Sequence, residues 1–264
     1  MNLLNIIEKL DLEKIDHEEF LKPAMRRGLF KKASDYTLKA ALASIPFAMA
    51  ALPKIAKAAT NDANSDVLNF ALTLEYLEAE FYATALQSTG LIPGSDMAVI
   101  AQISKHKTAH VAFLKSALGA AAVAKPTFDF TAGGTFADVF TKYETFLTLA
   151  QAFEDTGVRA YKGQAGNITN KTFLTYALQI HSVEARHASE IRRMRGNKGW
   201  IVLSNSETVL APIYAGEDNL MQGGVDISKL PALAGISKES LTEAFDEPLA
   251  KDKVLEIASL FIAK

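Results

Sequence analysis

Hydrophobic positions recur at helical spacing over four long segments that begin after residue 61. Apolar residues that repeat every three or four positions form one stripe along a helix, and the segments are separated by glycine and proline, which end helices. Long helices joined by turns are typical of an antiparallel four-helix bundle. The sequence therefore predicts an all-α bundle in residues 61–196, with helices in 65–90, 95–119, 135–166 and 169–196.

The first 60 residues have a different pattern. Arg26 and Arg27 precede an uncharged apolar run, 40–52, and small residues follow it. A charged region, a short apolar region and a small-residue cleavage site are typical of a signal peptide, and a spanning helix would need about 20 apolar residues. The paired arginines favour the twin-arginine route, with cleavage near Ala59 and a location in the bacterial periplasm or cell envelope. The alternative is an amphipathic helix that docks on the bundle of a cytoplasmic protein.

Composition excludes several classes of function. The formal net charge of −2 gives no reason to expect a nucleic acid or an anionic membrane as partner. The chain has no cysteine, so disulfides, thiolate metal sites and a cysteine nucleophile are excluded. Once the export segment is removed, we expect no stable membrane span. Residues 197–264 predict an irregular arm that ends in two short helices and packs on the bundle.

Charged residues inside the helical pattern point to a metal site. Two glutamates each have a tyrosine seven residues further on, and two histidines each follow a charged residue by three positions. These residues are Glu75 with Tyr82, Glu154 with Tyr161, Lys107 with His110, and Glu184 with His187. Residues three or seven positions apart share a helix face, so the pattern reads as two related hairpins. One carboxylate from each of two helices plus Glu-x-x-His from each of the others is the di-iron arrangement of helical bundles.

Four stretches resemble the ferritin-like superfamily: "DVLNFALTLEYLEAEFYATAL", "HVAFL", "FEDTGVRAY" and "HSVEARHASEIRRM". They look most like its exported bacterial branch, which includes desiccation-related proteins of plants and fungi. The resemblance covers residues 61–195 and extends to the tail segment "PIYAGEDNLMQGGVD". It implies iron or manganese as cofactor. The positions that match the family's metal ligands are Glu75, His110, Glu154, Glu184 and His187.

Lys107 departs from the family pattern, because it stands where a glutamate normally bridges the two metals opposite Glu184. Two divalent ions and an ammonium group would face only Glu75, Glu154 and Glu184, and unit charges about 4 Å apart interact by about 4 kcal/mol at an effective dielectric of 20. The sequence therefore predicts a metal-free or single-metal centre, with the single ion held by Glu154, Glu184 and His187 away from Lys107.

Two classes of function follow. The first is a metal-dependent redox protein that acts on dioxygen, peroxide or ferrous iron, in its full form a di-iron or di-manganese oxidoreductase. The second is a metal-free helical scaffold of the cell envelope that serves stress protection or protein contacts. Whether the protein is an enzyme, which electron partner it would use and whether it forms homo-oligomers stay open.

Nearby polar residues also have plain structural interpretations. Glu78 and Glu80 are expected on the solvated surface, because a charge on a helix usually faces water. His106 could form a separate site with His110, but we expect it to flank the core. His181 is either a residue that orients a metal ligand or an ordinary surface histidine. The two tyrosines, Tyr82 and Tyr161, are candidates for hydrogen bonds to the ligands, and equally for core packing with a satisfied hydroxyl.

Overall fold

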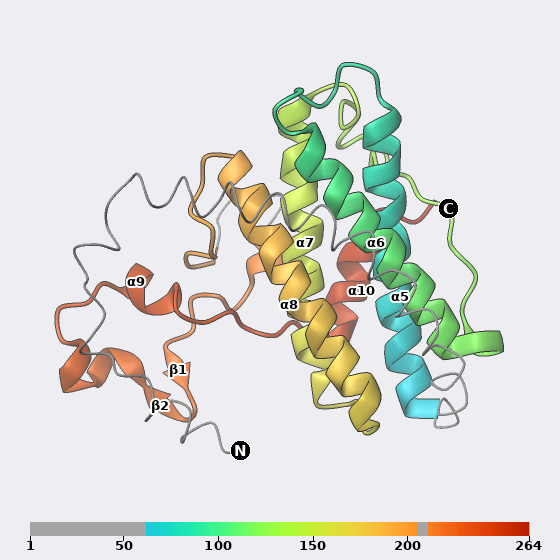
Figure 1. Ribbon diagram of the computed structural model, residues 1–264. Coiled ribbons are helices and arrows are strands. Elements are labelled where there is room, and N and C mark those ends of the chain that lie inside the picture. The colour runs from blue at the N-terminus through green and yellow to red at the C-terminus, as the bar shows by residue number, and fades with distance from the viewer. Residues whose placement is uncertain (1–61, 205–210, 264) are drawn as a thin grey trace, which may run out of the picture. The chain divides into compact units, whose positions relative to one another are not determined.

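The computed structural model describes residues 62–204 and 211–263, and the predicted export segment lies outside them. Its four long helices pack as two hairpins, α5 with α6 and α7 with α8, and α5 also contacts α7 (Figure 1). The helices are α5 (Asp62–Gln87), α6 (Met97–Leu118), α7 (Tyr143–Ala165) and α8 (Lys171–Met194). Within the described ranges, no helix combines the length and apolar character needed to cross a bilayer.

Two predicted helix starts were wrong. The first long helix begins at Asp62 and not at residue 65. The third begins at Tyr143 and not at residue 135. Before it, the Asp129 carboxylate accepts hydrogen bonds from the backbone N–H groups of Thr131 and Gly133, and these bonds hold the chain in successive turns. Such local side-chain bonds compete with helix formation.

One end of the bundle is closed by an aromatic cluster. The Phe81 ring on α5 stacks on Phe146 at a centroid distance of 5.0 Å and meets Phe153 edge-on at 4.9 Å, both on α7. Phe81 and Phe146 are completely buried. Burying an aromatic side chain of this size stabilises the fold by about 1.5–3 kcal/mol. This cluster fixes α5 against α7 next to the polar residues described below.

The C-terminal arm consists of short elements. The first regular element of the arm is a 3-10 turn, η4 (Ala211–Tyr214). A similar turn, η3 (Gly119–Ala121), follows α6 in the bundle. A two-stranded antiparallel hairpin then pairs Met221 with Asp226. The remaining elements are β1 (Met221–Gln222), β2 (Val225–Asp226), η5 (Ile227–Lys229), η6 (Pro231–Leu233), α9 (Lys238–Thr242) and α10 (Lys251–Ser259).

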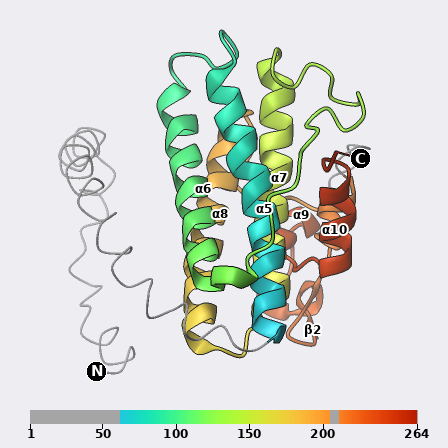
Figure 2. The ribbon, with the colours of Figure 1, turned by 90° about the vertical axis from the view of Figure 1, so that its right-hand side faces the viewer.

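The arm buries the outer face of α7. Figure 2 shows α10 beside the α5–α7 side of the bundle, where Val254 and Ile257 join an apolar cluster with Phe70 of α5. Arg159 of α7 is fully buried and donates hydrogen bonds to the backbone carbonyls of Ile213, Ala215 and Glu247. As a result α7 is covered on both sides, and its side chains from Leu149 to Tyr161 are all buried.

Candidate metal centre

Ionisable residues from all four long helices meet inside the bundle. Because the spacing i, i+3 places two side chains on one helix face, three of the helices each contribute a pair. The centre comprises Glu75 and Glu78 from α5, Lys107 and His110 from α6, Glu154 from α7, and Glu184 and His187 from α8. All are buried except His110, whose side chain is 13% exposed. The structure thus brings together the residues selected from the sequence and adds Glu78.

Lys107 contacts every carboxyl group in one half of this centre. Its fully buried ammonium group lies 2.7 Å from Glu78 Oε2 and 2.9 Å from Glu154 Oε2, and it also donates to Glu184 Oε2. The three carboxyl groups come from three different helices, so one ammonium group ties α5, α7 and α8 to α6. Burial would lower the pKa of Lys107, but the carboxylates of Glu154 and Glu184 outweigh burial and raise it well above its ordinary value. Lys107 therefore remains charged.

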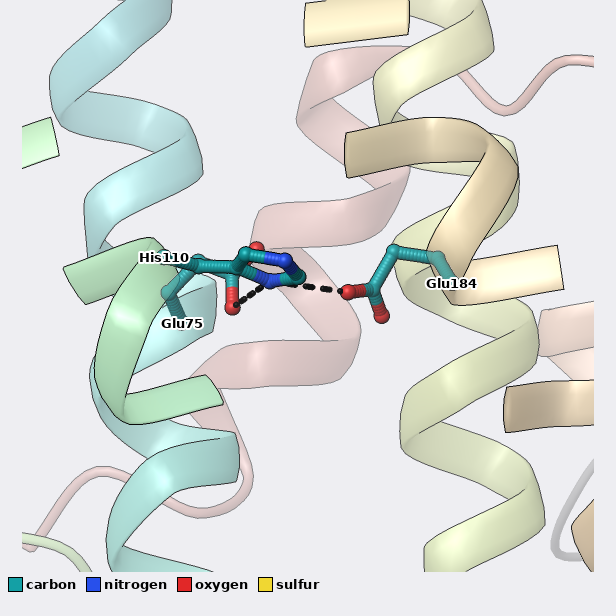
Figure 3. A group of neighbouring side chains, drawn as sticks. All are labelled: Glu75, His110 and Glu184. Carbon is teal, nitrogen blue, oxygen red and sulfur yellow. Dashed lines mark hydrogen bonds and ion pairs between the residues drawn. The ribbon is translucent and has the colours of Figure 1, made fainter. Parts of the chain in front are cut away.

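The other half contains Glu75, His110 and Glu184 (Figure 3). His110 Nδ1 lies 3.2 Å from Glu75 Oε2 and 3.2 Å from Glu184 Oε1. One ligand atom from each residue lies within 4.8 Å of the others, which suits a single ion. Glu184 Oε1 is buried and accepts no hydrogen bond from the described residues. A buried carboxylate oxygen is costly unless a cation compensates it, and without a metal ion the protonated His110 beside it is that cation.

A second group with similar spacing consists of Glu154, Glu184 and His187. His187 Nδ1 lies 3.2 Å from Glu154 Oε2 and 3.9 Å from Glu184 Oε1. The Lys107 ammonium group contacts the same Glu154 oxygen and the second oxygen of Glu184. The geometry of this group would allow a single ion, as the sequence predicts, but the expectation that the group lies away from Lys107 was wrong. The lysine stem is long enough to carry its charge across to α7 and α8, and it already occupies this half.

Glu78 is the residue that sequence reasoning missed. It was expected on the surface, but it is only 3% exposed and pairs with Lys107, whereas Glu80 next to it forms an exposed pair with Lys125. Space for Glu78 exists because α7 has a glycine opposite: a Cβ atom on Gly157 would lie 3.2 Å from Glu78 Oε1. The spacing from Glu75 could have indicated this position, since residues three apart share a helix face.

Glu78 also changes the charge count on which the sequence argument rested. The centre has four carboxyl groups and not three. Burial raises the pKa of Glu78 well above its ordinary value, and Lys107 only partly offsets it. The pKa of Glu154 moves the other way: burial would raise it, but Lys107 and His187 together hold it well below its usual range. Glu78 therefore holds a proton more readily than Glu154.

Each of the two tyrosines bonds to the glutamate of the other helix and not to the glutamate of its own helix. Tyr82 of α5 donates a 2.7 Å hydrogen bond to Glu154 Oε1 of α7, and Tyr161 of α7 donates a 2.8 Å bond to Glu75 Oε1 of α5. Burial raises the pKa of both phenols well above 10, so both remain donors. Each glutamate consequently has one oxygen held by a tyrosine and the other turned toward a histidine. The two hairpins are related in this respect, and each orients the ligand of its partner.

Two other histidines of the described residues, His106 and His181, lie outside the two groups. His106 is half-buried on α6; its Nδ1 lies 2.9 Å from His187 Nε2 and its Nε2 lies 2.8 Å from Gln102. It thus links His187 to the surface and forms no site with His110. His181 is half-buried and its Nε2 has no hydrogen-bond partner among the described residues. No hydrogen bond or ion pair joins it to a candidate metal ligand within the described residues, so the orienting role has no support in the geometry.

The pH dependence of stability should report on His110. Burial lowers its pKa, but Glu75 and Glu184 outweigh burial and raise it to about 9. The unfolded value is about 6.5, so the stabilisation is complete below pH 6.5 and is lost as the pH rises through 9. We expect the unfolding free energy of chelator-treated protein to fall by about 1–3 kcal/mol over this window. Urea titrations at pH 6 and 9 would measure it; an undiminished fall in His110→Gln would contradict the assignment.

The residues present fit one metal ion better than two. Carboxylate and imidazole groups suit iron and manganese. One divalent ion and the Lys107 ammonium group carry three positive charges, which match the carboxylates of Glu75, Glu154 and Glu184 while Glu78 keeps its proton. A second divalent ion would leave positive charge in excess even if Glu78 ionised. It would also have to displace Lys107 from two ligand oxygens.

Comparison with known proteins agrees with the helical architecture. No curated protein matches the chain. The ferritin-like domain family matches residues 63–197, which contain every residue of the centre and all four long helices except the first residue of α5. This match extends over half of the chain, and the chain therefore belongs to the ferritin-like domain family.

Proposed function

We propose that this protein is a ferritin-like protein of the bacterial cell envelope whose altered centre binds at most one iron or manganese ion. Glu75, His110 and Glu184 would hold the ion, and Lys107 takes the place of a second one. The observation that carries the proposal is the Lys107 ammonium group, which contacts three buried carboxyl groups on three helices. Family membership supports the presence of a metal.

The residues around the proposed ion have separate tasks. Tyr161 holds one oxygen of Glu75, which leaves the other oxygen beside His110. His110 must lose its Nδ1 proton to act as a ligand, and its partly exposed ring lets that proton leave to solvent. Iron or manganese bound there would supply one-electron redox chemistry toward dioxygen, peroxide or ferrous iron. Phe81 and its aromatic neighbours exclude water from one end of the centre.

Metal retention tests the proposal. We expect chelator-treated protein, loaded with Mn²⁺ or with Fe²⁺ without oxygen and then desalted, to retain about one ion per chain by elemental analysis. Glu75→Gln should weaken retention at least tenfold, because the site loses half of its ligand charge. Glu80→Gln is the matched control, because Glu80 lies on the same helix but pairs with Lys125 at the surface. Retention of no metal would favour the metal-free scaffold, and two ions would favour the di-metal oxidoreductase.

Export can be tested separately. Arg26 and Arg27 precede the apolar run of the predicted twin-arginine signal. Replacing both by lysine keeps the charge but removes the arginine pair, and we expect the protein to accumulate as an uncleaved precursor in the cytoplasm. Fractionation and N-terminal sequencing would measure this, with Lys31→Arg plus Lys32→Arg as the control. If the double lysine variant were still found in the envelope, the twin-arginine route would be contradicted. That result would leave the metal-binding proposal untouched.

A further inference from the structure

A polar cavity of about 330 Å³ is lined by the first half of α7, the C-terminal end of α8 and the start of the arm, and none of its lining residues belongs to the metal centre. The two other cavities described have volumes of about 10 Å³ each and are lined almost entirely by apolar atoms. Ligand cavities for small molecules usually measure roughly 300–1,000 Å³. This cavity is therefore large enough for a small ligand, and no step of the proposed function uses it.

The floor of the cavity is a buried polar network. Gln151, Arg192 and Tyr214 line it, and none of them is more than 7% exposed. Tyr214 donates a 2.6 Å bond to Asp155 and accepts a 2.8 Å bond from Gln151, so both side chains are held in place. Arg192 is oriented by Asp155 and lies over the Tyr214 ring at 5.4 Å. The hydrogen-bonding groups on this side are consequently rigid.

The cavity lies at a strongly basic end of α8. Arg192 is balanced by Asp155, and Lys198 on the wall is balanced by Glu243. Arg193 and Arg195 form no ion pair with a carboxylate in the described part of the chain, and Arg195 donates to Gln151, which lines the cavity. Positive charge is thus in excess, and the C-terminal carbonyl groups of the helix offset it only in part. This excess favours an anionic ligand.

A second part of the lining, called here the apolar wall, consists of Trp200, Ile201 and Val202. Trp200 is 45% exposed, so the indole has a free surface against which a planar ring can pack. Neither a bare phosphate ion nor a neutral hydrocarbon would use both walls. From these contacts we infer that the cavity binds a small planar carboxylate, with its ring on Trp200 and its carboxylate toward the basic end of α8.

Trp200 allows a direct test, because it is the only tryptophan in the chain. The full-length protein would be titrated with benzoate, with benzyl alcohol as the neutral planar probe and inorganic phosphate as the non-planar anion. Calorimetry and Trp200 fluorescence would follow binding. We expect benzoate to bind at least about tenfold more tightly than either comparison probe, and its affinity to fall with added salt. Equal affinity for benzyl alcohol or phosphate, or no binding at millimolar benzoate, would overturn the inference.

Two variants distinguish the contributions of the basic end of α8 and of Trp200 to binding. Arg195→Gln should weaken benzoate about two- to fivefold, which is the range for a partly exposed ionic contact. Arg186→Gln is the matched control, because Arg186 is an exposed arginine of α8 whose hydrogen bond goes to the Ser182 carbonyl, whereas Arg195 bonds to Gln151 of the cavity lining. Trp200→Leu should weaken the binding of benzoate, measured by calorimetry, but should leave the weak binding of phosphate unchanged. If Arg195→Gln and Arg186→Gln bound benzoate equally, with unchanged thermal unfolding, the basic end of α8 would play no part.

Discussion

Lys107→Glu is expected to raise the bound iron or manganese from about one ion to about two per chain. The substitution removes an ammonium group from the centre and adds a carboxylate, so the local charge changes by two. Glu154 and Glu184 would lose a cation that contacts both, and either a second divalent ion or protons must replace it. The new carboxylate would stand three residues before His110 and could bridge two ions, which an amine cannot do.

The matched control is Lys105→Glu, which makes the same charge change on α6 at an exposed position. Both variants would be loaded with Mn²⁺ or with Fe²⁺ without oxygen, desalted and analysed for metal. Lys107→Gln adds a second comparison, because it removes the positive charge without supplying a ligand. An increase in Lys107→Glu and none in Lys105→Glu is expected. Two ions in the unmodified protein, or an equal increase in both variants, would show that Lys107 does not limit occupancy.

Arg159→Met is expected to release the C-terminal arm from α7. The guanidinium group is completely buried, and its Nε lies 2.8 Å from Glu217 Oε1. Burial raises the pKa of Glu217 to about 7 even though Arg159 lowers it, so without the arginine this carboxyl group would be buried without its cation. Breaking a buried ion pair by removing one partner typically costs about 3–5 kcal/mol. We expect a loss of this size, with the carbonyl groups of the arm losing their donors as well.

Denaturant unfolding would measure the loss, and limited proteolysis would show whether cleavage moves to the arm. Arg193→Met is the matched control, since Arg193 is exposed on α8. The double variant Arg159→Met with Glu217→Gln should be more stable than Arg159→Met alone, because no buried charge is left unpaired.

Gly163→Ala offers an independent test, because a Cβ atom there would collide with the Leu249 carbonyl oxygen. If neither Arg159→Met nor Gly163→Ala changed the proteolysis pattern, this account of arm docking would be contradicted.

Helical periodicity alone located all four long helices, because a stripe of apolar residues must face a core whatever the other helices do. The starts of two were misplaced. The turns before Tyr143 include backbone N–H groups of Thr131 and Gly133 that donate to the Asp129 carboxylate, and periodicity does not reveal such bonds. The same spacing rules selected the residues that meet in the centre. They place a residue on the inner face of its own helix, and the inner faces of packed helices converge.

Only the tertiary structure decided the partners of these residues. Tyr82 and Tyr161 share a face with the glutamate of their own helix, but in the folded chain each bonds to the glutamate of the other helix. Glu78 is a surface residue by helix statistics, and it is buried because Gly157 of α7 leaves room for it. The reach of Lys107 across the bundle likewise depends on interhelical distances. Sequence spacing determines the face on which a side chain lies, whereas packing between helices decides which charge it meets there.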